Sequence, residues 1–381
     1  MNYTSLTTPA ALAAFCEQQA NQAWLAIDTE FIRQDTYYPI LALVQICTQE
    51  GELVLIDPLA LADLSPLWQL MANPKVCKVL HSARQDIEVL FQLGKQMPQN
   101  LFDTQTACVF LGYGDMAGFG RVVEAEYNVS LNKALSRTNW LQRPLSDEQI
   151  HYALDDVHYL APLYKKLHTL LTAEQKQALT QDFAEMLNPA LYQIEPNQAW
   201  LKVKGTKGLN TKQLGLVKQL AAWREQAAIG QNLPRRWVIS DDAILQLAKR
   251  PARTLEALYK VPDLNAGTVR QYGEVIIEQL DLAFASPDNW PEKPANPPGL
   301  SPQEDILLQL ATSFAQQVAQ DNGIIVNNLY QKAGLVTLIR QQPSSLENGW
   351  RRLLLGDPLK ELLNNQAWLG VVDQKIVLTK T

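Results

Sequence analysis

The sequence lacks the features that mark secreted, membrane-spanning or disulfide-stabilised proteins. No apolar run approaches the roughly 18 residues that suggest a membrane span, and no basic start precedes an apolar run at the N-terminus. The chain has four cysteines, which are Cys16, Cys47, Cys77 and Cys108. They form no CxxC pair, which argues against a disulfide framework or a cysteine zinc site and favours a cytoplasmic location.

A phosphate-binding loop is missing as well. The glycine-rich stretch LGYGDMAGFG, residues 111–120, lacks the lysine and the Ser or Thr of such a loop. It also follows a helical pattern rather than a strand. We interpret this stretch as a connection between elements.

Charge is distributed unevenly along the chain. Residues 1–195 hold 12 Lys and Arg against 22 Asp and Glu, whereas residues 200–260 hold 12 basic residues against 4 acidic ones. This asymmetry suggests cation-dependent chemistry in the first half and binding of a polyanion in the second. An asymmetry that arose by chance is the alternative.

Short apolar runs in the first half predict a mostly buried sheet covered by helices, and so an α/β domain. The expected strands are 23–32, 41–47, 52–56, 76–80 and 100–103. An N-terminal helix is expected after Thr8 as cap, with Pro9 in its first turn. The other expected helices are 83–93, 104–112, 118–127 and 147–171.

The second half shows almost no strand signal. The stretch 211–284 is helical throughout, and six prolines among the 17 residues 286–302 predict an extended linker. The remainder returns to helix, with a short strand pair near WLGVVDQKIVLTK. We therefore predict an α/β domain over 1–195, a helical module over 208–287, a Pro-rich linker over 286–302 and a second helical module over 300–381.

The run WLAIDTEFI, residues 24–32, places two acids on one face of an apolar strand. Side chains of a strand alternate between its faces, so Asp28 and Glu30 project from a surface that they share with Trp24 and Ala26. Two neighbouring carboxylates there repel each other and are costly to desolvate unless a cation lies between them. The pattern predicts a bound cation.

Two expected helices supply further acids. In HSARQDIEVLFQLG, Ser82 begins a capping-box pattern that places Asp86 in the first turn, on the apolar face. An acid favoured only by the helix N-terminus is the alternative for this residue. In SDEQIHYALDDVHYL, Ser146 begins a second capping box, and Tyr152 and Asp156 lie one turn apart on one stripe.

These four acids, from one strand and two helices, predict that the cation is a metal ion. Hard divalent cations such as Mg²⁺ and Mn²⁺ take oxygen ligands. Two such ions about 4 Å apart can clamp an in-line displacement at phosphorus, where one generates a hydroxide nucleophile and the other stabilises the leaving oxygen. We therefore expect two divalent ions, Mg²⁺ or Mn²⁺.

Three motifs, DTEF, HSARQDIEVL and YALDDVHYL, resemble in this order the motifs of the DEDD 3′–5′ exonucleases. The stretches LFDTQTAC and RTNWLQRPLS resemble bacterial ribonuclease D in particular. The resemblance spans roughly residues 20–170 and implies a ribonuclease H-like fold with a mixed sheet. It also implies metal ligation by Asp28, Glu30, Asp86 and Asp156, with Tyr152 orienting or deprotonating the attacking water.

The last motif fits the spacing of both branches of that family, Y-x3-D and H-x4-D. Tyr152 lies four residues before Asp156, and His151 lies five before it. At about 100° per residue, Tyr152 is about 40° from Asp156 around the helix and His151 about 140°, which favours the tyrosine. Because a free tyrosine has a pKa near 10, we expect the metal to acidify the water and Tyr152 chiefly to position it.

Two further residues near the motifs have plainer interpretations. His81, which opens the second motif, is expected to be a structural histidine rather than a ligand. Asp103 is expected to be a surface acid, with a supporting role beside the site as the alternative.

The stretch LAAWREQAAIGQNLPRRWVISDDAILQLAKRPARTLEAL, residues 220–258, resembles the HRDC domain shared by ribonuclease D and RecQ-type helicases. Residues 303–381 resemble a second, more divergent module of this kind. Basic residues in the first module and before the third motif are expected to contact phosphates, with ordinary solvated faces as the alternative. The expected nucleic-acid contacts are Lys133, Arg137, Arg143, Arg224, Arg235 and Arg236.

The sequence therefore predicts a metal-dependent exoribonuclease that removes nucleotides stepwise from RNA 3′ ends and releases 5′-monophosphates. The resemblance suggests structured RNAs as substrates, precursor tRNA above all. One alternative is a DNA 3′–5′ exonuclease, because contacts to the 2′-hydroxyl cannot be located in the sequence. Another is a non-catalytic RNA-binding protein, which the presence of all four acids and the tyrosine disfavours. A monomer is the default expectation, since the sequence does not determine the oligomeric state.

Overall fold

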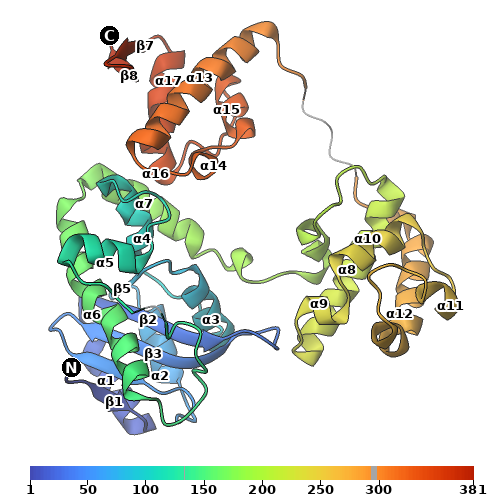
Figure 1. The fold of residues 1–381 in the computed structure, drawn as a ribbon, viewed down its shortest axis with the longest axis horizontal. Helices are drawn as coiled ribbons and strands as arrows, with labels where there is room; N and C mark the ends of the chain where they lie inside the picture. The colour runs from blue at the N-terminus through green and yellow to red at the C-terminus, as the bar shows by residue number, and fades with distance from the viewer. Residues whose placement is uncertain (133, 293–297) are drawn as a thin grey trace. The chain divides into compact units, whose positions relative to one another are not determined.

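A computed structural model describes residues 1–132, 134–292 and 298–381 (Figure 1). Its contacts divide the chain into two compact units. Unit 1 comprises Met1–Ile32, Leu41–Pro189 and Gly299–Thr381, and unit 2 comprises Arg33–Ile40 and Ala190–Pro298. Lys133 and the centre of the expected linker, 293–297, lie outside the described residues.

The core of the α/β domain is a six-stranded mixed sheet in the order β1-β4-β3-β2-β5-β6. Strand β2 pairs in parallel with β5, and β5 in parallel with β6, whereas β3 and β4 are antiparallel. The strands are β1 (Thr4–Leu6), β2 (Trp24–Ile32), β3 (Ile40–Thr48), β4 (Leu53–Ile56), β5 (Cys77–Leu80) and β6 (Leu101–Asp103). The five predicted strands are confirmed. Strand β1 was missed because it is only three residues long and buries only Leu6.

Helices surround this sheet (Figure 1). They are α1 (Pro9–Gln19), α2 (Ser65–Ala72), α3 (Arg84–Gly94), α4 (Thr104–Ala107), η1 (Cys108–Leu111), α5 (Phe119–Tyr127), α6 (Asp147–Leu170) and α7 (Ala173–Met186). The predicted capping box at Ser146 is confirmed, because its hydroxyl accepts the N–H of Gln149 and the Gln149 side chain accepts the N–H of Ser146. This box starts α6, the helix that packs on β2 and carries the third motif.

The predicted cap of α3 is wrong. Ser82 has a φ of 62°, and the helix begins after Ala83 without a side-chain cap from Ser82. The Ala83 N–H instead donates to the Asp103 carboxylate at 2.7 Å. Asp103, expected at the surface, is therefore buried, because it joins the end of β6 to the start of α3.

Unit 2 is a helical bundle around α8. Its elements after the short 3-10 turn η2 (Pro189–Leu191) are η3 (Pro196–Lys202), α8 (Thr211–Gln231), α9 (Arg235–Val238), α10 (Asp241–Lys249), α11 (Leu255–Leu258), α12 (Ala266–Ala285) and η4 (Pro287–Asn289). Helix α8 packs against η3, α10 and α12 around a core that includes Val217 and Leu220. Tyr37, from the connection between β2 and β3, packs against the same core.

The last part of unit 1 is mostly helical. Its elements are α13 (Pro302–Asp321), α14 (Val326–Leu329), α15 (Lys332–Ile339), α16 (Gly349–Arg351), the π-helix η5 (Arg352–Gly356), α17 (Asp357–Leu363), β7 (Ala367–Val372) and β8 (Lys375–Lys380). The antiparallel β7–β8 pair confirms the predicted strand pair. Among the described residues, no helix is long and apolar enough to span a bilayer.

Candidate active site

Strand β2 carries the first two acids in the interior of the sheet. It lies between β3 and β5, so both of its edges are paired. Leu25, Ala26 and Ile27 are fully buried, and this packing fixes which way the following side chains point. The Glu30 side chain is buried and that of Asp28 half-buried. A rigid strand therefore presents both carboxylates on one face.

Helix α6 brings Asp156 to the same place. Buried residues such as Ala153, Val157 and Leu160 hold the helix against the sheet. Single carboxylate oxygens of Asp28, Glu30 and Asp156 lie within 4.8 Å of one another. Three carboxylates at that spacing can share a divalent cation, for which oxygen ligands are preferred.

Asp86 belongs to the same electrostatic cluster but is held differently. It lies in the first turn of α3, is buried, and accepts a 2.5 Å hydrogen bond from the Thr29 hydroxyl. Its charge raises the pKa of Asp28, Glu30 and Asp156. Thr29 lies between the two acids of β2, and the sequence reasoning missed it. Its only signal was a hydroxyl residue between the two acids of the strand.

Burial raises the pKa of every one of these carboxyls. It raises that of Glu30 to about 9, and those of Asp86 and Asp156 to about 7, while that of Asp28 lies well above its ordinary value. Desolvation is the largest cause in each case, and neighbouring carboxylates add to it. A buried cluster that resists its own ionisation fits a divalent cation, whose charge would offset both effects.

Two cavities meet at Tyr152 and Asp156. One, of about 230 Å³, is lined by Asp28, His81, Phe119, Tyr152, Asp156 and Leu160. The other, of about 270 Å³, is lined by Leu131, Asn132, Leu135, Asp147, Glu148, His151, Tyr152, Asp155 and Asp156. Together they leave space for a ligand beside Tyr152 and Asp156. Phe119 was not predicted as a site residue.

His81 and Tyr152 have distinct environments in the first cavity. The His81 ring nitrogens lie 2.9 Å from the Thr104 hydroxyl and 2.8 Å from the Ala117 carbonyl, in agreement with a structural histidine. The pKa of Tyr152 is raised above 10, first by burial and then by Asp156, Glu30 and Asp28. The phenol therefore keeps its proton at neutral pH and is suited to orienting a water molecule.

His151 lies on a different side of α6 from Tyr152. The side chain of His151 is exposed, and its Nδ1 lies 2.7 Å from the Asp147 carbonyl one turn earlier. It lines only the second of the two cavities, whereas Tyr152 lines both. This placement favours the tyrosine over the histidine.

The expected phosphate contacts are placed unequally. Arg137 is exposed, and Lys133 lies outside the described residues. Arg143 forms a two-point ion pair with Asp57, at 2.6 and 2.8 Å, and donates to the Ala42 carbonyl at 2.6 Å. These bonds give Arg143 a structural role, and its contact with RNA stays a prediction.

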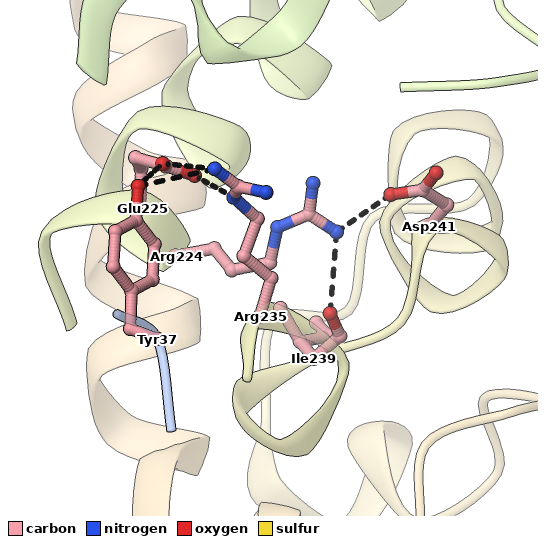
Figure 2. A network of polar contacts seen from close by, with 6 residues as sticks. All are labelled: Tyr37, Arg224, Glu225, Arg235, Ile239 and Asp241. Carbon is pink, nitrogen blue, oxygen red and sulfur yellow. Dashed lines mark hydrogen bonds and ion pairs between the residues drawn. The ribbon is translucent and has the colours of Figure 1, made fainter. Parts of the chain in front are cut away.

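The three arginines of unit 2 also differ from one another. The side chain of Arg224 is buried, and it pairs with Asp241 at 2.6 Å and donates to the Ile239 carbonyl (Figure 2). Arg235 pairs with Glu225. Arg236 is exposed. Contacts of all three with RNA stay predictions, and Arg236 has the most accessible side chain.

Comparisons with known families and structures agree with this geometry. A family model described as 3′–5′ exonuclease matches residues 3–172, and one described as HRDC domain matches residues 213–280. The chain is 35% identical to a ribonuclease D of Pseudomonas paraeruginosa, over 93% of this chain and 96% of that protein. It is 34% identical to one of Sphingobium indicum, over 99% and 98%.

Solved structures give the same result. The crystal structure of Escherichia coli RNase D matches with a TM-score of 0.82 and 30% identity, over 96% of this chain and 99% of that chain. The catalytic core of RRP6 from Trypanosoma brucei, at 24% identity and a TM-score of 0.55, shares the fold over 75% of this chain and 80% of its own. The predicted fold class is thus confirmed. The chain belongs to the ribonuclease D family and is a 3′–5′ exoribonuclease.

Proposed function

We propose that Asp28, Glu30, Asp86 and Asp156 hold two divalent ions, Mg²⁺ or Mn²⁺, and that these carry the exoribonuclease reaction. The convergence of carboxylate oxygens from β2 and α6 within 4.8 Å is the observation that supports this most strongly. When bound, the ions would supply an acidified water and neutralise charge on the leaving oxygen. The product released at each step is a nucleoside 5′-monophosphate.

The residues of the chain then have separate tasks. The sheet and α6 hold the carboxylates rigidly, so little reorganisation is needed when a substrate enters. Thr29 fixes the orientation of Asp86 through its hydroxyl. The Tyr152 phenol, which keeps its proton, donates a hydrogen bond that orients the attacking water. The cavity beside Phe119 receives the terminal nucleotide.

We further propose that the substrates are single-stranded 3′ tails of structured RNAs, with precursor tRNA as the leading example, processed in the cytoplasm by a monomer. The solved Escherichia coli relative is described as an exoribonuclease involved in structured RNA processing. The basic excess over residues 200–260 suits an RNA body. All four cysteines are free thiols, which suits a reducing compartment.

The test compares the wild type with Asp28→Asn on a 3′-tailed RNA and on its DNA equivalent, in Mg²⁺, Mn²⁺ or EDTA. We expect metal-dependent release of mononucleotides from the RNA, and a loss of at least about 10³-fold in Asp28→Asn. Asp263→Asn is the matched control, because Asp263 is an exposed acid of unit 2 whose positive φ an asparagine tolerates.

Three results would each count against the proposal in a different way. Preference for DNA would retain the chemistry and change the substrate. If Asp28→Asn cleaved RNA as fast as the wild type, the carboxylate cluster would not be needed for the reaction. Binding of RNA without cleavage under every metal condition would indicate a binding protein.

A further inference from the structure

Unit 2 contains a cavity that the exoribonuclease reaction does not use. Its volume is about 480 Å³. One wall is the connection between β2 and β3, and the other is the helical bundle around α8. The lining residues are Arg33, Gln34, Thr36, Tyr37, Ile194, Ala199, Lys202, Arg224, Glu225, Pro234, Arg235, Arg236, Trp237 and Asp241.

The wall formed by 33–40 is fixed to the bundle by a buried polar network (Figure 2). The Tyr37 hydroxyl donates to the Glu225 carboxylate, and Arg235 donates to both Glu225 oxygens, at 2.5 and 2.8 Å. Arg235 also donates to the Tyr37 hydroxyl at 3.0 Å. The Glu225 side chain is 1% exposed and that of Arg235 is 35% exposed, so the pair is desolvated on the glutamate side only.

The backbone of the same wall is held as well. The side-chain oxygen of Asn232, which caps the C-terminus of α8, accepts the N–H groups of Tyr37 and Tyr38 at 3.1 and 3.2 Å. The segment 33–40 is thus built into the bundle by main-chain and side-chain bonds, and the cavity between them is a fixed feature.

The charges of the lining are predominantly positive. Five of the lining residues are cationic and two are acidic. The two acids are each matched by an arginine, since Glu225 pairs with Arg235 and Asp241 with Arg224. Lys202 and Arg236, which also line the cavity, are cationic and exposed. The net positive charge therefore lies at the accessible part of the cavity.

An aromatic ring completes the site. Trp237 follows Arg236 on α9, lines the cavity and is 56% exposed. An exposed indole is costly to leave in water, and its flat face stacks on nucleobases of any sequence. Cations beside an aromatic face are the combination that single-stranded nucleic acid requires, because phosphates and unstacked bases must be bound together.

We propose that this cavity is a subsite for single-stranded RNA. In it Lys202 and Arg236 contact phosphates of the chain upstream of the 3′ end, and one unstacked base lies against Trp237. A volume of about 480 Å³ suits one nucleotide. The identity of the strand as RNA rests on the proposed function. The subsite itself rests on the charge and the ring of the lining, and it carries no sequence preference.

The experiment measures RNA binding to the full chain in Mg²⁺, in an Asp28→Asn background that prevents cleavage. The test variant is Arg236→Gln with Trp237→Ala, and the ligand is a fluorescein-labelled single-stranded RNA followed by anisotropy. The control variant is Arg270→Gln with Tyr259→Ala, because both residues are exposed in the same module and lie outside the lining.

We expect the test variant to bind at least about tenfold more weakly than the control variant. Arg236→Gln alone reduces the slope of log K against log salt concentration by about 0.7, the value for one phosphate contact on a single strand. Trp237→Phe restores most of the affinity lost in Trp237→Ala, since a smaller ring still stacks.

Equal affinity and equal salt slope in the test and control variants would overturn the subsite. Thermal unfolding first shows whether each variant is folded. If the double variant is unfolded, the salt slope of Arg236→Gln alone tests the subsite, because this variant changes one exposed side chain. Binding does not depend on catalysis, so the two proposals fail separately. If the wild type cleaves RNA and the test variant keeps its RNA affinity, only the subsite is refuted. If the test variant loses RNA affinity and the wild type does not cleave RNA, only the proposed function is refuted.

Discussion

At the residue scale, the clustered carboxylates of Asp28, Glu30 and Asp156 are costly to ionise while no cation neutralises them. Their pKa values are raised by burial first and by neighbouring carboxylates second, with Asp86 acting on all three. The folded protein therefore holds protons that the unfolded chain would release. The same arrangement that suits cation binding opposes folding in the absence of the cation.

Asp156→Asn is expected to stabilise the metal-free protein. The Asp156 pKa is raised to about 7, whereas that of an unfolded aspartate is about 3.9. Between these values the folded state binds more protons than the unfolded state, so stability falls as pH rises through the window. In EDTA at pH 8 the variant should be more stable than the wild type by on the order of 1–3 kcal/mol, as measured by urea unfolding.

The pH series gives the control for this effect. The difference between Asp156→Asn and the wild type should shrink toward pH 4, where Asp156 is protonated in the folded state and about half protonated in the unfolded state. If the difference in unfolding free energy stayed constant from pH 4 to 8, the folded protein would not raise the pKa of Asp156, and the explanation would be wrong.

Thr29→Val is expected to lower kcat by about 10- to 100-fold, because residues that orient ligand carboxylates have effects of this size. Valine has nearly the shape of threonine but cannot donate to Asp86. Thr29→Ser keeps the hydroxyl and should retain most of the activity. Steady-state kinetics on a 3′-tailed RNA measures both variants, and equal rates in Thr29→Val and wild type would remove Thr29 from the site.

At the element scale, the elements with strong local sequence signals were predicted correctly. The apolar run of β2 and the capping box of α6 both appear as expected, so Asp28, Glu30, Tyr152 and Asp156 were placed on the right elements. The start of α3 was predicted wrongly. Its Ala83 N–H donates to the buried carboxylate of Asp103, which lies 20 residues away in the sequence. Because this contact comes from the end of β6, the sequence around α3 shows no pattern that predicts it.

Contacts between α7 and α16 provide a prediction at the same scale. Asp182 accepts the Trp350 N–H at 2.9 Å, and Gly349 has a φ of 61°. A Cβ on Gly349 would overlap the Asp182 carboxylate. Gly349→Ala should therefore break this contact and lower the free energy of unfolding by more than the roughly 1 kcal/mol of a positive-φ alanine.

Hydrogen exchange at the Trp350 amide measures this loosening directly. Gly299→Ala is the control, because a Cβ there would meet nothing within 4 Å. Unchanged protection of the Trp350 amide in Gly349→Ala would show that the α7–α16 contact does not need the glycine.

At the scale of the whole molecule, charge counts suggested which half of the chain binds a polyanion, which stays a prediction, but they did not identify the residues that line the cavity. The basic excess over 200–260 pointed to polyanion binding. Yet Arg224 and Arg235 form ion pairs, and Arg33 and Lys202, from outside the HRDC-like stretch 220–258, line the cavity. The contact of Tyr37 with Glu225 joins residues 188 apart in the chain. No local pattern in a single sequence carries such a pairing.

The central claim is that the carboxylates of β2, α3 and α6 jointly bind divalent cations, and calorimetric titration with Mn²⁺ tests it most directly. At pH 7.5 the Glu30 carboxyl, with its pKa raised to about 9, is protonated. Mn²⁺ binding should therefore release protons, so the measured heat should vary with the ionisation enthalpy of the buffer. Asp156→Asn should bind Mn²⁺ much more weakly, and Asp263→Asn should bind it as the wild type does. Equal Mn²⁺ affinity in Asp156→Asn, with heats independent of the buffer, would contradict the account.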